Sequence, residues 1–236
     1  DLLGLVECMC TVTFLPLRNS DFILTSNRDE DPKRATQQMV DRSVNEKVVH
    51  FPQDPKAGGT WFASDQEEFT LCLLNGGFEA HEYDPPYRRS RGLMVLDFFE
   101  FSNTESFIDQ YDFQGIEPFN LVVIDHSNTA LVLNELVWDE EQLHVRSLDI
   151  DVPYIWSSTS LYPQEVRAER RSWFVEWLSE RSDYSQPDIQ HFHQFGGNGD
   201  AWNNFVMNRN GEVMTVSVTS LKKSGPQFNF EHKSLI

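Results

Sequence analysis

The stretch MCTVTFLPLRNSDFILTSNRDE, residues 9–30, predicts how the fold begins. Cys10 to Phe14 alternates polar and apolar side chains, Asn19 to Asp21 is a cluster of turn-forming residues, and Phe22 to Thr25 resumes an apolar run. Alternation, a turn and a second apolar run together are typical of a β-hairpin. The N-terminal part of the chain is therefore expected to pair as two antiparallel strands.

The second strand of this hairpin ends in four polar residues, Asn27-Arg28-Asp29-Glu30. Successive strand residues point to opposite faces, which predicts Arg28 and Glu30 on one face and Asn27 and Asp29 on the other. An adjacent arginine and carboxylate can orient a thiol or a substrate carbonyl. The alternative is a solvated strand end, since surface ion pairs are common and weak.

The rest of the chain predicts an α+β fold with antiparallel sheets. Apolar runs and helical periodicity alternate along the sequence in the order strands, helix, strands, helices, strands, with short hairpin-type connections. Helices on the outer faces of two stacked antiparallel sheets would bury these apolar stripes. The expected strands are 69–74, 119–125, 129–137, 142–148, 153–156, 204–207 and 211–221; the expected helices are 88–102, 163–180 and 186–195; residues 31–62 are expected to form a long surface loop.

Composition limits the partners of the protein. Across 236 residues, Lys and Arg total 19 against 37 Asp and Glu, a net charge of −18, which argues against nucleic acid and anionic membrane surfaces. Aromatic residues make up 13% of the chain, unlike an acidic disordered protein, and no apolar run reaches the ~20 residues of a membrane-spanning helix. The length favours a single domain over 10–236, preceded by a leader or expression remnant over 1–9. The oligomeric state stays open.

The three cysteines are Cys8, Cys10 and Cys72. An odd number in a chain of this size favours a reducing, cytoplasmic location. Removal of Met9 would leave Cys10 with a free α-amine, whose ordinary pKa of ~7.7–8.0 lets it accept the thiol proton near neutral pH. Cys10 is thus a candidate nucleophile that carries its own base, and the alternative is a buried strand cysteine.

Asn75 is the third candidate for chemistry. It ends an apolar run and precedes Gly76-Gly77, so its amide could donate to a developing oxyanion beside an open turn; an ordinary Asn-Gly turn is the alternative. His191 and His193 lack a third spaced ligand and are interpreted as a surface pair, so neither a metal site nor a cofactor is expected. Trp61 is interpreted as part of the core or of a pocket wall.

Four segments of the first half together resemble the NRDE proteins, which are relatives of transport and Golgi organisation protein 2. The resemblance covers Met9 to the C-terminus and is specific mainly over 10–77. Its segments are MCTVTF at 9–14, TSNRDE at 25–30, AGGTWF at 57–62 and LLNGG at 73–77.

The resemblance implies the N-terminal nucleophile hydrolase fold, a four-layer αββα sandwich shared with penicillin V acylases and conjugated bile acid hydrolases. It implies Cys10 as nucleophile, Arg28 and Asp29 as the residues that orient the amine and thiol of Cys10, and Asn75 as the donor to the oxyanion. Glu30 and Asp31 remain alternatives for the acidic role. The substrate-binding residues expected beside them are Asn27, Glu30, Trp61, Gly76 and Ser158.

The predicted function is that of an N-terminal-cysteine hydrolase cleaving a linear C–N amide bond of a small N-acyl compound. The second half departs from the acylases, because Ser158 falls where relatives carry Ser-Asn and no late arginine is clearly equivalent. These departures favour the alternative, a non-catalytic carrier or binding protein for a lipid-like, acyl-coenzyme or haem-type ligand on the same fold.

Overall fold

Strands β1 (Met9–Pro16) and β2 (Phe22–Glu30) form the predicted N-terminal hairpin, with Cys10 directly opposite Arg28. The computed structural model describes residues 9–236, so residues 1–8, most of the expected leader, lie outside the described part. Contacts group the described chain into two compact units, 9–35 with 151–236, and 36–150. A single domain over 10–236 stays a prediction.

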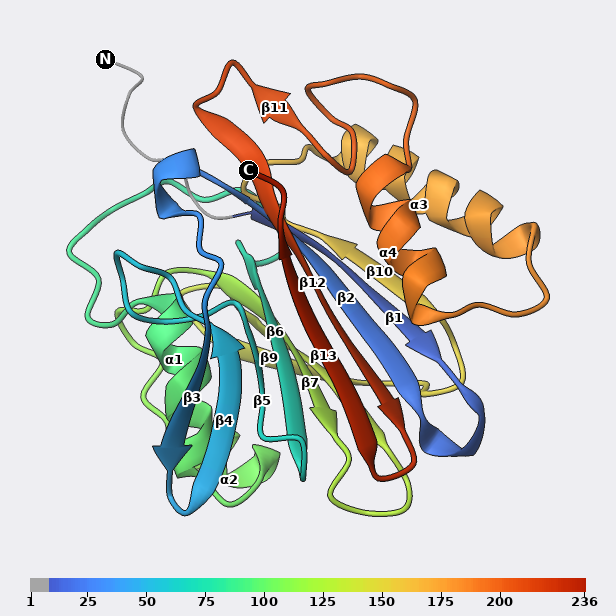
Figure 1. The fold of residues 1–236 in the computed structure, drawn as a ribbon. Helices are drawn as coiled ribbons and strands as arrows, with labels where there is room; N and C mark the ends of the chain where they lie inside the picture. The colour runs from blue at the N-terminus through green and yellow to red at the C-terminus, as the bar shows by residue number, and fades with distance from the viewer. Residues whose placement is uncertain (1–8) are drawn as a thin grey trace. The chain divides into compact units, whose positions relative to one another are not determined.

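The first unit is built on a six-stranded antiparallel sheet in the order β10-β1-β2-β12-β11, with β13 also paired to β12. Two helices lie together on one face of this sheet (Figure 1). Their apolar side chains pack with Leu15, Ile23 and Phe205. The remaining elements are β10 (Tyr154–Ser157), α3 (Gln164–Ser179), α4 (Gln186–Phe195), β11 (Asn208–Arg209), β12 (Val213–Ser224), β13 (Gln227–Ser234) and the 3-10 turns η1 (Arg18–Ser20) and η2 (Pro32–Arg34).

The second unit is a seven-stranded antiparallel sheet whose strands follow one another in chain order from β3 to β9. Helix α1 packs against β5 and β6. The elements are β3 (Met39–Val44), β4 (Lys47–Pro52), β5 (Phe62–Ser64), β6 (Phe69–Asn75), α1 (Arg91–Asp97), η3 (Phe98–Glu100), α2 (Thr104–Gln110), β7 (Phe119–Asp125), β8 (Val132–Trp138) and β9 (Leu143–Leu148).

The prediction of an α+β chain with antiparallel sheets is confirmed, and helix α4 has the expected bounds. The long loop expected over 31–62 is wrong, because it contains the hairpin β3–β4. Its first strand alternates between exposed and half-buried side chains, so it lacks the apolar alternation that marks a strand with a buried face. Edge strand β13 was missed, and residues 204–207 form turns instead of a strand.

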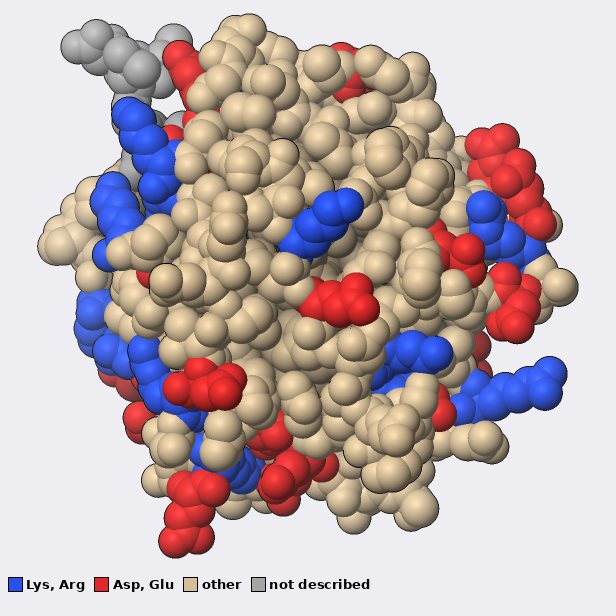
Figure 2. Space-filling view, viewed as in Figure 1, with Lys and Arg blue, Asp and Glu red and all other residues tan. Residues whose placement is uncertain are grey.

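Two features of the described residues bear on partners. Between residues 9 and 236, no helix is both long enough and apolar enough to cross a lipid bilayer. On the face in Figure 2, Lys and Arg side chains gather mainly along the left edge, and Asp and Glu side chains lie among them.

Helix α1 is held against the sheet of the second unit by the segment Gly58-Gly59-Thr60-Trp61. A Cβ on Gly59 would lie 2.4 Å from the backbone carbon of Gly92 in α1. Thr60 N–H donates to the Gly92 carbonyl at 3.0 Å, and the Thr60 hydroxyl donates to the Pro52 carbonyl at 2.8 Å. Gly59 is therefore required by a close approach of two backbones.

We expect Gly59→Ala to lower the free energy of unfolding by about 3 kcal/mol or more, because backbone atoms have no rotamer that relieves the clash. Gly58 has a φ of +71° but open space around it, so Gly58→Ala is the matched control and should cost about 1–2 kcal/mol of left-handed strain. Urea unfolding of both variants measures the difference. Equal losses would contradict the close-approach explanation.

Candidate active site

Arg28 and Glu30 form a buried ion pair at the end of β2. The Arg28 side chain is 1% exposed and its Nη2 lies 3.3 Å from Glu30 Oε2, while its Nη1 donates to the Arg34 carbonyl at 2.8 Å. Arg34 Nη1 reaches the same carboxylate oxygen at 3.1 Å. Two guanidinium groups thus share one buried carboxylate, which offsets the cost of removing these charges from water.

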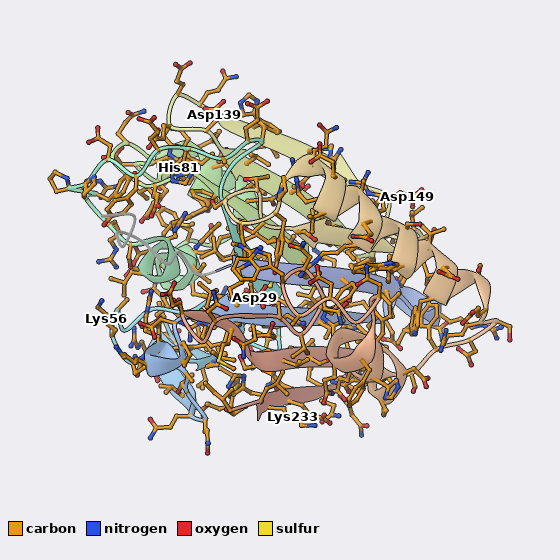
Figure 3. All side chains as sticks on the ribbon, turned by 90° about the horizontal axis from the view of Figure 1, so that it is seen from above. Asp29, Lys56, His81, Asp139, Asp149 and Lys233 are labelled. Atoms are coloured by element: carbon orange, nitrogen blue, oxygen red, sulfur yellow. The ribbon has the colours of Figure 1, made fainter. Side chains whose placement is uncertain are left out.

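The three consecutive acids 29–31 have different surroundings. Asp29 accepts from the Tyr162 hydroxyl at 2.7 Å and from the Thr215 hydroxyl at 2.5 Å (Figure 3 labels Asp29). Asp31 accepts from the Lys33 backbone N–H at 2.9 Å and so caps η2. Glu30 forms the buried ion pair with Arg28 described above.

Asn27 lies on the face of β2 that packs against α4, together with Asp29, as the alternation predicts. Its amide Nδ2 donates to the carbonyls of His193 and Phe205 at 2.9 and 2.7 Å. Its Oδ1 therefore faces His193 Nδ1, 2.6 Å away, which must carry the proton. His193 Nε2 is then an acceptor for the Thr13 hydroxyl at 2.8 Å.

His193 is fully buried, and this burial lowers the pKa of its imidazole to about 3, with a further contribution from the Arg170 charge. A histidine in the unfolded chain has a pKa of ~6.5 and binds a proton below that pH. The ring of His193 in the folded protein stays neutral down to a pH of about 3. The unfolded state therefore binds more protons between these two pKa values, and stability rises with pH in this range.

We expect the free energy of unfolding to fall by about 1.4 kcal/mol per pH unit from this group as the pH drops from ~6.5 toward 3. His193→Gln removes the titration and should flatten the pH dependence by that amount. Urea unfolding between pH 4 and 7 measures the slope, and nitrogen NMR should report a neutral ring protonated on Nδ1. An imidazolium signal at pH 5 would contradict the assignment.

A β-bulge in β12 places Ser217 opposite Arg28, on the same face of the sheet. Thr215 is opposite Asp29 and Ser217 is opposite Arg28, so Val216 is the extra residue. Without the bulge, Thr215 and Ser217 would point to the same face. Ser217 is 1% exposed, and its hydroxyl has no hydrogen-bond partner among the described residues. A buried hydroxyl in this state costs free energy, as side chains reserved for function often do.

Ser217→Ala should leave the free energy of unfolding unchanged or raise it by up to about 1 kcal/mol, because no hydrogen bond within the described residues is lost. Ser220, on the same strand, pairs with Thr25 at 2.8 Å and Gln186 at 3.2 Å, so Ser220→Ala should lower it by about 1–2 kcal/mol. Thermal and urea unfolding of the two variants test this contrast. A clear loss of stability in Ser217→Ala would show that the hydroxyl is bonded.

The other predicted site residues fall in both units. Cys10 is the second residue of β1, and its side chain lies outside the described part of the structure. Ser158 is buried and comes one residue after Ser157, which pairs with Thr11. Asn75, at the end of β6, and Trp61 are buried in the second unit, where Gly76 has a φ of +85° and donates to the Pro118 carbonyl at 3.0 Å.

Sequence reasoning missed the groups that surround β2. Arg170 is fully buried on α3 among apolar side chains, and an arginine in an apolar stripe of a helix is itself a signal of a buried partner. The interpretation of His191 and His193 as a surface pair is wrong for His193, which faces the sheet and is buried. Among residues 9–236, no cluster of three or more potential metal ligands occurs.

The fold is similar to that of solved amide hydrolases. The Caenorhabditis elegans N-acylethanolamine-hydrolyzing acid amidase ortholog matches with a TM-score of 0.60 and 16% identity, over 90% of this chain and 92% of the other. Two variants of conjugated bile acid hydrolase from Clostridium perfringens match with TM-scores of 0.54 and 0.52 at 10% and 9% identity, over 96% of this chain and 92% of theirs. The predicted N-terminal nucleophile hydrolase-like fold is confirmed.

Within this class the chain can be assigned to a family. The model of the family described as Transport and Golgi organisation 2 matches residues 8–195, and the chain belongs to this family. The resemblance found in the NRDE segments is therefore confirmed. No curated protein matches the sequence.

Proposed function

We propose that this protein is an N-terminal-cysteine hydrolase that cleaves the linear C–N amide bond of a small N-acyl compound. The observation that carries the proposal is the pairing of Cys10 with Arg28 across β1 and β2, with Arg28 held by the buried Glu30. Directly opposed residues of an antiparallel pair share one face of the sheet. In the proposal Cys10 acts together with Arg28, the residue opposite it in the register. The similar solved structures are named as an amidase and hydrolases.

The proposed reaction uses Cys10 as nucleophile and base together. Removal of the residues through Met9 frees the α-amine, which takes the thiol proton as sulfur attacks the amide carbon. The amine returns this proton to the leaving nitrogen as the C–N bond breaks, and water then hydrolyses the thioester to release the acid. A cation beside the sulfur lowers the pKa of a thiol, and this is the role proposed for Arg28, with Glu30 as the acid that holds it.

The donor of the oxyanion hole proposed here is Asn75, as predicted from its position before Gly76. A positioned amide donor typically contributes 10²–10³-fold to the rate of such a reaction. Asn75→Ala is expected to lower kcat by that order. Trp61 and Ser158 are proposed to contact substrate, and their replacement should raise KM more than it lowers kcat.

The test is hydrolysis of N-acylethanolamines and conjugated bile acids by protein expressed from Met9, with intact mass to show that Met9 is removed. Cys10→Ala should abolish release of the free amine, while Cys72→Ala, at a buried cysteine in the second unit, should leave turnover within about twofold of wild type. A thioester adduct on Cys10 in quenched reactions would support the mechanism. Full activity in Cys10→Ala would overturn it, and binding of acyl compounds without turnover would favour the carrier.

A further inference from the structure

Arg170 on α3 is fully buried and contacts the end of β1. Its Nη1 donates to the Thr11 hydroxyl, and its Nη2 donates to the Asn204 carbonyl at 2.5 Å. Its guanidinium lies 3.7 Å from the centre of the Tyr162 ring, within the range of a cation–π contact. The guanidinium of Arg170 is therefore fixed by three groups: the Asn204 carbonyl, the Tyr162 ring and the hydroxyl of Thr11, which follows Cys10.

Tyr162 continues this chain of contacts to β2. Its hydroxyl donates to Asp29 at 2.7 Å, and Thr215 from β12 donates to the other carboxylate oxygen at 2.5 Å. Burial, and next the Asp29 charge, raise the pKa of Tyr162 well above its ordinary value, so the phenol stays protonated and remains a donor. Both oxygens of Asp29 thus have fixed donors on the helix side of the sheet.

The two ends of this chain adjoin the proposed reacting pair. Thr11 follows Cys10 in β1, and Asp29 follows Arg28 in β2. The register brings Met9 opposite Asp29 and Cys10 opposite Arg28. The first residues of a strand open most readily unless they are tied down. Contacts at Thr11 and Asp29 restrain the backbone of both strands at the point where Cys10 and Arg28 face each other.

We propose that Arg170, Tyr162 and Asp29 are positioning residues that hold the start of β1 in register with β2 and so keep Cys10 opposite Arg28. They act through Thr11 and the backbone and touch no reacting atom. The inference rests on the proposed function only for the role of the thiol. Asp29, expected from sequence to serve Cys10 directly, acts in this proposal from the opposite face of β2.

A second buried network offers a matched control. Thr13 and Asn27 lie on the same face of the same two strands and bind His193 at 2.8 and 2.6 Å, distances close to the 2.7 and 2.5 Å of the bonds to Asp29. The β1 residue of this second network, Thr13, lies two residues beyond Thr11 and three beyond Cys10. Loss of either network should lower stability, whereas only the Tyr162 network should control Cys10.

The experiment measures the rate at which iodoacetamide alkylates Cys10 across pH, with mass spectrometry of peptides to separate Cys10 from Cys8 and Cys72. The thiolate displaces iodide and the proton passes to solvent, so the pH midpoint reports the pKa of the thiol. Tyr162→Phe should raise this midpoint by about one unit and slow alkylation at neutral pH about tenfold, since the thiol loses its fixed cation. His193→Gln should change the rate less than about twofold, at an equal or larger loss of thermal stability.

A second pair of variants keeps the test informative if Tyr162→Phe fails to fold. Thr215→Val removes the other donor to Asp29 and should shift Cys10 in the same direction, and Thr215→Ser should restore the wild-type profile. Unchanged Cys10 profiles in Tyr162→Phe and Thr215→Val, or an equal shift in His193→Gln, would overturn the proposal. If the expected shifts occur in a protein that hydrolyses no amide, the positioning role stands and the hydrolase proposal fails.

Discussion

Strand β2 is buried along all nine of its residues, and the last four of these are polar. A buried polar or charged group costs several kcal/mol unless it is paired, so this strand dictates what its neighbours must supply. On one face, Arg28 requires Glu30 and a backbone carbonyl. On the other, Asn27 and Asp29 require donors and acceptors from α4, from the Tyr162 turn and from β12. The side chains and carbonyls that bind residues 27–30 supply these partners from α4, from Tyr162 and from β12.

The same constraint explains why the chemistry of the two faces differs. The ion pair of Arg28 and Glu30 is buried, and Arg28 lies opposite the second residue of β1. The networks on the helix side are closed, since each donor and acceptor of Asn27 and His193 has a partner there. A closed hydrogen-bond network of this kind gives rigidity and a unique arrangement.

The glycine segments of the second unit serve packing and backbone conformation. Gly59, in the segment that leads into β5, allows the backbone to pass close to that of α1 at Gly92. Gly76 follows Asn75 and has a left-handed backbone conformation. Both positions need glycine for reasons of space or φ. A motif that identifies a family can therefore report a requirement of the fold, as Gly59 does here.

The sequence alone determined the features that depend on neighbours along the chain. Period-two alternation predicted the N-terminal hairpin and the division of 27–30 between two faces, and the sequence also predicted a short helix over 186–195, which is α4. The four segments between Cys10 and Gly77 predicted the family. Tertiary structure decided that Glu30 forms a buried ion pair with Arg28, that His193 is buried, and that a bulge places Ser217 opposite Arg28. The partners of Asp29 and Asn27 lie 133, 186 and 166 residues away in sequence, and local patterns carry no information on pairs so distant.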